Sequence, residues 1–201
     1  MLAVAPPAGS SSEQLTRAMR SLEAAFLIGV EGVTELWLVR HADAYELATE
    51  AADPPLSEIG KQQAARLAQR IRHLAPAAVY SSPYRRALET ARTISDDVHV
   101  DDRLVEIALE IDEDGTLDFK EEPDKVVARM TAALGEMVER HAGRRVVAVG
   151  HGGAIIAYLT DVLQLEPGRL RMLPYYTSIS VVRVLGDRRM VGAVGDVGHL
   201  E

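Results

Sequence analysis

An arginine and a histidine stand side by side at the end of an apolar run, and they are the first residues that could do chemistry. The run reads Leu36-Trp37-Leu38-Val39-Arg40-His41-Ala42-Asp43. A neutral imidazole is a competent nucleophile, and a neighbouring guanidinium can hold an anion in a fixed bidentate geometry. A continuous apolar run before a polar break indicates a buried parallel strand, and open α/β sheets bind ligands at the carboxyl ends of such strands. The pair predicts an anion site; the alternative is a strand that ends in polar residues at the surface.

A second histidine follows another buried strand. His151 lies in the turn Gly150-His151-Gly152-Gly153, directly after the apolar run 145–149. A polar, glycine-rich turn at this position leaves backbone N–H groups free to bind an anion. If the strands before His41 and His151 are neighbours in the sheet, both imidazoles meet in one crevice.

Two arginines occupy a helix start. Arg85 and Arg86 follow Ser82-Pro83, in which serine is a predicted N-cap and proline the first helical residue. Cations in a first turn oppose the helix dipole, so their placement makes sense if an anion also binds there. Together with the histidines they predict a phosphoryl site without a metal; a pair of solvated arginines is the alternative.

Elements that alternate between strand and helix position these residues. Periodicity and helix-capping residues predict strands near 36–40, 77–81, 145–149, 179–185 and 190–194, and helices near 58–74, 83–94, 123–141 and 152–163. We therefore expect an α/β fold, a three-layer sandwich with a mainly parallel central sheet and helices on both faces.

The amino-terminal segment, residues 1–33, is predicted to stand apart from a domain at 34–201. Met1 to Ser12 reads as a flexible lead, and Glu13 to Ile28 as an amphipathic helix. Its apolar residues recur at spacings of four, three and four: Leu15, Met19, Leu22 and Phe26. The helix either packs on its own domain or forms the contact of a homodimer.

Composition excludes several classes of function. The formal net charge of −8 and the aromatic content of 4% argue against binding to nucleic acid or to an anionic membrane surface. The chain contains no cysteine, which excludes disulfides and thiolate chemistry. It has neither a membrane-length apolar run nor a signal-peptide core, so we expect a cytoplasmic protein.

Four motifs occur in a fixed order along residues 34 to about 195. They are Leu38-Val39-Arg40-His41-Ala42, Pro55-Leu56-Ser57-Glu58-Ile59-Gly60-Lys61-Gln62-Gln63-Ala64, Tyr80-Ser81-Ser82-Pro83-Tyr84-Arg85-Arg86-Ala87-Leu88-Glu89-Thr90-Ala91, and Val149-Gly150-His151-Gly152-Gly153. In this order they resemble the signature of the histidine phosphatase superfamily, which is also called phosphoglycerate mutase-like. Each motif alone is weak, but the four in order, each at the edge of a predicted strand or helix, are specific.

The resemblance implies a role for each matching residue. His41 would accept the phosphoryl group, while Arg40, Arg86 and His151 would hold its oxygens. This agrees with the chemistry, because a phosphoryl transition state spreads charge over oxygens that cationic donors stabilise. Arg85 is one residue early and is expected to assist substrate binding, as is the backbone of Gly152. The resemblance implies no metal or other cofactor.

The leaving alcohol needs a proton from a carboxylic acid. The family supplies it from a Leu-x-Glu stretch between the two histidine turns, and Leu104-Val105-Glu106 fits this pattern. Glu106 is therefore the expected general acid, with Glu110 as its competitor.

Departures from the family pattern bear on the reaction. Ala42 replaces a more usual glycine, and Leu47 stands where an asparagine often contacts phosphate. The segment after the expected acid is short, whereas a mutase needs a long lid to retain its intermediate. We therefore expect a phosphatase that acts on a phosphorylated small molecule or on the phosphohistidine of a protein. A phosphoglycerate mutase-type phosphotransferase and a non-catalytic phospho-ligand binder are the alternatives.

The acidic stretch 110–121 resembles an EF-hand calcium loop. Gly115 lies at the turn position and Glu121 at the final, bidentate position. Glutamate replaces aspartate as the first ligand and no second loop accompanies it, so we expect a solvated acidic loop and keep calcium binding as the alternative.

Overall fold

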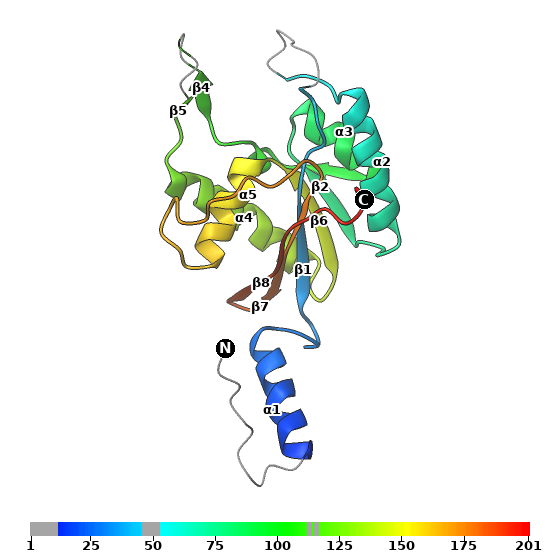
Figure 1. Cartoon of the computed structure of the whole chain (residues 1–201), viewed down its shortest axis with the longest axis vertical. Coiled ribbons are helices and arrows are strands. Elements are labelled where there is room, and N and C mark those ends of the chain that lie inside the picture. The colour runs from blue at the N-terminus through cyan, green and yellow to red at the C-terminus, as the bar shows by residue number, and fades with distance from the viewer. Residues whose placement is uncertain (1–11, 46–52, 112–113, 115–116) are drawn as a thin grey trace.

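A computed structural model describes residues 12–45, 53–111, 114 and 117–201 of the chain (Figure 1). Residues 1–11, most of the predicted lead, and Leu47 lie outside the described residues. The helices and strands are α1 (Ser12–Ala25), β1 (Thr34–Arg40), α2 (Glu58–Arg72), β2 (Ala78–Ser81), α3 (Arg85–Ile94), β3 (Val98–Val100), the 3₁₀ turn η1 (Asp102–Leu104), β4 (Leu109–Ile111), β5 (Leu117–Phe119), α4 (Pro123–Arg140), β6 (Arg145–Gly150), α5 (Gly152–Val162), β7 (Ile179–Leu185) and β8 (Arg188–Asp196).

The central sheet has six strands in the order β3-β2-β6-β1-β7-β8. The first four run parallel, whereas β7 pairs antiparallel with both β1 and β8. β1 and β6 are neighbours, and their register pairs Arg40 with Gly150. His41 and His151 follow these two residues, so both lie at the carboxyl ends of neighbouring parallel strands. The sequence analysis expected both imidazoles in one crevice if these two strands were neighbours, and the pairing of β1 with β6 confirms that they are.

Helices cover both faces of the sheet, with α2 and α3 on one side and α4 and α5 on the other (Figure 1). The period of two along each strand divides its side chains between two cores. In β1, Leu36 and Leu38 face α4 and α5, whereas Trp37 and Val39 face α2 and α3. The predicted three-layer α/β sandwich is confirmed.

The start of α3 differs from the prediction. The helix begins at Arg85, with Tyr84 as its N-cap, instead of at Ser82 and Pro83. The Ser82 N–H donates to the Val149 carbonyl at 2.9 Å, which prolongs the β2–β6 pairing. The chain therefore stays extended through Ser82, whose hydroxyl accepts from the Tyr84 N–H and also contacts His151.

The amino-terminal helix α1 stands clear of the sheet and its covering helices (Figure 1). None of its residues is buried, so the interpretation in which it packs on its own domain is wrong. Leu27 lies just after α1 and is buried, with 1% of its surface exposed. Its backbone has a positive φ of 57°. Its turn directs α1 away from the core. In the described part of the chain, no helix is long and apolar enough to cross a membrane.

The apolar stripe of α1 keeps the homodimer hypothesis open. Leu15, Met19, Leu22 and Phe26 are each about half exposed, at 55, 48, 52 and 53%. Their heptad-like spacing is that of helices that pair, and the acidic and basic residues of α1 balance, so no net charge opposes a second copy.

Replacing an apolar residue at the centre of this stripe by aspartate should dissociate the dimer into monomers. We expect the wild type to sediment as a dimer and Leu22→Asp as a monomer, because the substitution places a charge in the apolar contact. Ser21→Asp adds the same charge on the opposite side of the helix and is expected to leave the dimer intact. A wild-type monomer at micromolar concentration in analytical ultracentrifugation would refute the hypothesis.

Candidate active site

His41 lies at the carboxyl end of β1 and is 2% exposed. Its backbone N–H donates to the Gly150 carbonyl at 2.9 Å, which fixes the residue against β6. Its Nδ1 is 2.7 Å from the carbonyl oxygen of Ala42. A carbonyl can only accept, so Nδ1 carries the hydrogen and Nε2 keeps its lone pair. This is the tautomer that a nucleophilic Nε2 requires.

His151 lies beside it, with 5.1 Å between the two ring centroids. It is fully buried and precedes α5 as its N-cap residue. Its Nε2 donates to the hydroxyl oxygen of Ser82 at 2.9 Å, and its Nδ1 accepts from Arg86 Nη2 at 3.3 Å. His151 is therefore neutral in the opposite tautomer, with Nε2 protonated.

Arg86, in the first turn of α3, links the two rings. Its Nε donates to His41 Nε2 at 3.3 Å, its Nη2 contacts His151, and its Nη1 pairs with Asp53 at 3.2 Å. The side chain is almost fully buried. One guanidinium therefore touches the Nε2 of His41, the second histidine and a carboxylate.

Arg40 supplies the second cationic group. Its Nη1 donates to the Pro174 carbonyl at 2.7 Å, and its guanidinium carbon lies 4.2 Å from the centre of the Tyr176 ring. Its Nε is buried and has no hydrogen-bond partner among the described residues. A buried donor without a partner is costly, which is consistent with an anion as its missing acceptor.

Burial keeps both imidazoles neutral. Burial, assisted by the charges of Arg86 and Arg40 and opposed by the hydrogen bond to the Ala42 carbonyl, lowers the pKa of His41 to about 3. Burial also lowers the pKa of His151 to about 2, followed by the effects of His41 and Arg86. His41 is therefore unprotonated at neutral pH, as the predicted nucleophile must be.

The second sequence motif holds the loop after His41. The Ser57 hydroxyl donates to the Asp43 carboxylate at 2.6 Å, and the Gln63 side-chain oxygen accepts from the Asp43 N–H at 2.9 Å. A Cβ on Gly60 would stand 1.9 Å from the Asp43 carbonyl oxygen, so only glycine lets α2 approach this loop. The motif therefore fixes the loop that follows the predicted nucleophile.

The third motif acts in the same way through Thr90. Its hydroxyl accepts from the Ala42 N–H at 3.0 Å and donates to the Arg86 carbonyl at 2.7 Å. This single side chain fixes Ala42, the residue after His41, relative to the helix turn that carries Arg86.

Glu106 lies at the amino end of α5. Its two carboxylate oxygens accept from the N–H groups of Ile107 at 2.9 Å, Gly153 at 3.2 Å and Ala154 at 2.9 Å. A Cβ on Gly153 would lie 2.7 Å from one of these oxygens, so the glycine permits the contact. The structure thus brings the expected acid to the helix that begins with His151.

Arg129 is a site residue that the sequence did not reveal. Extending from α4, it donates to the carbonyls of Arg103, Val105 and Glu106 at 2.7, 2.8 and 3.2 Å. It also pairs with Glu121 at 2.8 Å. Arg129 therefore fixes the backbone on either side of Glu106, and no motif signals it because its partners are carbonyl groups.

Other predicted site residues lie farther out or contribute backbone only. Arg85 is exposed and its Nε donates to Glu89 at 2.7 Å, so the structure does not bring its side chain into the site. Glu110 is exposed on β4 and pairs with Lys120 at 3.1 Å. At Gly152 a Cβ would come within 3.4 Å of Arg40 Nε, so its backbone borders the predicted anion site.

The acidic stretch forms a small antiparallel hairpin of β4 and β5. Gly115, the turn residue of the calcium hypothesis, lies outside the described residues. Glu121, its last ligand, is bound by Arg129, which lowers the pKa of the carboxyl. This contact favours an acidic hairpin over a calcium loop.

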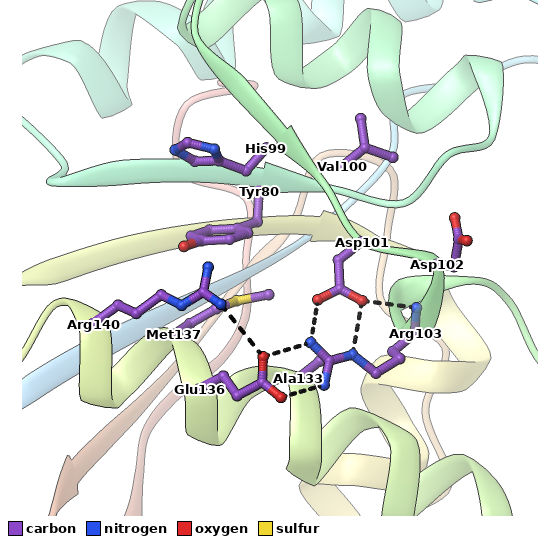
Figure 2. A pocket seen from close by; sticks show the side chains of 10 residues that line it. All are labelled: Tyr80, His99, Val100, Asp101, Asp102, Arg103, Ala133, Glu136, Met137 and Arg140. Carbon is purple, nitrogen blue, oxygen red and sulfur yellow. Dashed lines mark hydrogen bonds and ion pairs between the residues drawn. The ribbon is translucent and has the colours of Figure 1, made fainter.

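A separate hollow of about 530 Å³ lies between β2, β3, η1 and α4 (Figure 2). Arg103 pairs in it with Asp101 and Glu136, each at 2.8 Å, and Glu136 also pairs with Arg140. Its two arginines are thus both engaged by carboxylates, and none of the predicted site residues lines it. The hollow is distinct from the histidine pair.

The family is settled by comparison with known proteins. A family model for the histidine phosphatase superfamily (branch 1) matches residues 36–122 and 110–197. The chain belongs to the histidine phosphatase superfamily, which confirms the resemblance drawn from the four motifs.

Relatives within this family carry different names. A phosphoglycerate mutase-like protein 4 from Arabidopsis thaliana is 29% identical, over 83% of this chain and 87% of its own. A metal-independent phosphoserine phosphatase from the same plant is 28% identical, over 84% of each chain. The solved structure of YhfR from Bacillus stearothermophilus is 27% identical and superimposes with a TM-score of 0.72, over 84% of this chain and all of its own. The names of these relatives thus refer to a phosphatase in one case and to likeness to a mutase in another.

The buried histidines should make the protein sensitive to acid. Both rings have a reference pKa of 6.5, so they protonate in the unfolded chain well before they do in the folded one. The unfolded chain therefore binds more protons below that pH, and the free energy of unfolding falls as the pH falls, by about 2 kcal/mol per histidine at pH 5. Urea unfolding at pH 7 and pH 5 measures this loss.

A double variant provides the comparison. His41→Gln/His151→Gln is expected to lose less stability than the wild type between the two pH values, whereas His73→Gln, which removes an exposed histidine, should lose as much as the wild type. Equal losses in the double variant and the wild type would contradict the assignment of two neutral buried rings.

Proposed function

We propose that the protein is a phosphatase that hydrolyses phosphomonoesters through a phosphohistidine intermediate, without a metal. The observation that carries this proposal is the contact of the Arg86 guanidinium with His41 Nε2 and His151 Nδ1, both at 3.3 Å. A nucleophilic nitrogen thus faces a cationic donor that can bind phosphoryl oxygens. Arg40, with its unpartnered Nε, supplies a second cation for the same anion.

The proposed first step forms the bond from His41 Nε2 to phosphorus and breaks the bond from phosphorus to the ester oxygen. The leaving oxygen takes a proton from the Glu106 carboxylic acid. A water molecule then attacks the phosphohistidine, gives its proton to the Glu106 carboxylate and releases inorganic phosphate. Glu106 would act first as acid and then as base.

Hydrolysis is favoured over transfer by the segment between Glu106 and α4. In the described residues this segment contributes one small hairpin, β4 and β5, whose strands are three residues each. A mutase must retain and reorient its phosphorylated intermediate and must exclude water while it does so. A long segment that closes over the site supports this. A short hairpin favours water as the acceptor.

The nucleophile can be tested with 4-nitrophenyl phosphate in the presence of a chelator. We expect turnover by the wild type, and a loss of about a thousandfold or more in His41→Ala, because the covalent step disappears. His73→Ala, which removes an exposed histidine, is the matched control. Equal turnover in wild type and His41→Ala would mean that another residue is the nucleophile.

The alternatives give other outcomes in the same assays. Conversion of 3-phosphoglycerate to 2-phosphoglycerate, stimulated by a bisphosphate primer, would replace the phosphatase proposal with a mutase. Phosphate binding in calorimetry without turnover or an acid-labile phosphoenzyme would indicate a phospho-ligand binder.

The role of Glu106 can be separated from that of Glu110 by the leaving group. Glu106→Gln should lower kcat/KM for n-butyl phosphate by about a hundredfold or more, since an alkoxide needs a proton. Its effect on 4-nitrophenyl phosphate should be much smaller, because nitrophenolate leaves without one. Glu110→Gln is the control and should change neither; if it produces the selective loss, the acid has been assigned wrongly.

A further inference from the structure

Four tyrosines gather around the two histidines, although the chain has only six tyrosines, two phenylalanines and one tryptophan. They come from three separate segments: Tyr45 follows β1, Tyr84 precedes α3, and Tyr175 and Tyr176 precede β7. Their shared location is therefore a property of the fold, and we call these four residues the tyrosine rim.

The inner two rings of the rim touch the predicted phosphate site. Tyr176 lies 5.9 Å from the His41 ring, with Arg40 stacked on its face. Tyr84 lies 5.1 Å from the His151 ring, and its ring centre is 4.8 Å from the guanidinium carbon of Arg86. Each inner ring thus borders one of the two arginines, with part of the ring left for a ligand.

The outer two rings continue this surface into solvent. Tyr45 is 53% exposed and its ring lies 6.3 Å from that of His41. Tyr175 is 56% exposed and lies 5.7 Å from Tyr176. Leu173, 67% exposed, adds an apolar side chain that packs against Gly152. Exposed aromatic surface beside a nucleophile is available to the part of a substrate that carries the phosphoryl group.

The charged groups near the rim are unsuited to an acidic substrate. Asp43 is tied to Ser57, and Asp53 pairs with Arg86. Arg85, which directly follows Tyr84, is paired with Glu89. The two arginines that the structure places at the histidines, Arg40 and Arg86, are both needed for the phosphoryl oxygens. A carboxylate carried by the substrate would therefore face the carboxylates of Asp43 and Asp53 and the uncharged rings of the tyrosine rim.

From this arrangement we infer that the tyrosine rim selects phosphomonoesters whose alcohol carries a flat, uncharged ring, of the aryl, benzylic or nucleoside class, over small acidic monoesters. The inference rests on the proposed phosphatase function and names the substrate class of that same site. Ring stacking on the rim would position the ester oxygen toward Glu106 while the arginines hold the phosphoryl group.

Esters with similar leaving groups test the inference. Benzyl phosphate and n-butyl phosphate both release a primary alcohol, so a difference in kcat/KM reports the ring. We expect benzyl phosphate to be favoured about tenfold, and phosphoserine to be hydrolysed less efficiently than either. Tyr45→Leu and Tyr175→Leu should each lower the ratio of benzyl to butyl kcat/KM. Phe26→Leu, which replaces an exposed aromatic residue directly after α1, the helix that stands clear of the sheet, should not (Figure 1).

The outcomes separate the two proposals. Hydrolysis of none of the three esters or of 4-nitrophenyl phosphate would refute the phosphatase itself. Hydrolysis with equal efficiency for benzyl and butyl esters, or with phosphoserine preferred, would overturn the inference and leave the phosphatase standing. If Phe26→Leu lowered the ratio of benzyl to butyl kcat/KM as much as the rim variants do, the inference would also be overturned.

Discussion

The site depends on one contact, the insertion of the Arg86 guanidinium between two buried, neutral histidines. A buried cation is costly unless hydrogen-bond acceptors surround it. His41 and His151 provide such acceptors only in opposite tautomers. The Ala42 carbonyl fixes the tautomer of His41, and the Arg86 donor at Nδ1 fixes that of His151, whose Nε2 then donates to the Ser82 hydroxyl. Neutral rings and a cation thus require one another, and the outcome is an imidazole lone pair directed at a charge that an anion can bind.

The sheet makes this contact possible. The parallel pairing of β1 and β6 aligns Arg40 with Gly150, so the two histidines emerge together. The extra pairing of Ser82 with Val149 extends β2 and brings the start of α3 to the same edge. The register of the three adjacent strands β2, β6 and β1 therefore determines how far Arg86 lies from His41 and His151.

Much of this arrangement could be predicted from the sequence, because it depends on signals local to the chain. Apolar runs before Arg40 and His151 indicated strand ends, and the order of motifs indicated their convergence. Residues that act by contacts distant in sequence could not be found in this way: Arg129 binds carbonyls that any residue would provide, and the tyrosine rim comes from three segments. Ser82 misled as an N-cap because its hydroxyl serves His151 instead. The packing of α1 also escaped prediction, since an apolar stripe does not say which surface will cover it.

The pairing of Asp53 with Arg86 has a consequence for the fate of the product of the proposed hydrolysis. A carboxylate already occupies one arm of the guanidinium, so a phosphate that took this arm would exchange one ion pair for another instead of creating a new one. Its binding free energy would be reduced by the free energy of the Asp53–Arg86 pair that it breaks. Inorganic phosphate would then be held less tightly than two neighbouring arginines suggest, and the aspartate would return to Arg86 when it departs. An internal competitor of this kind would favour rapid clearance of the site over affinity.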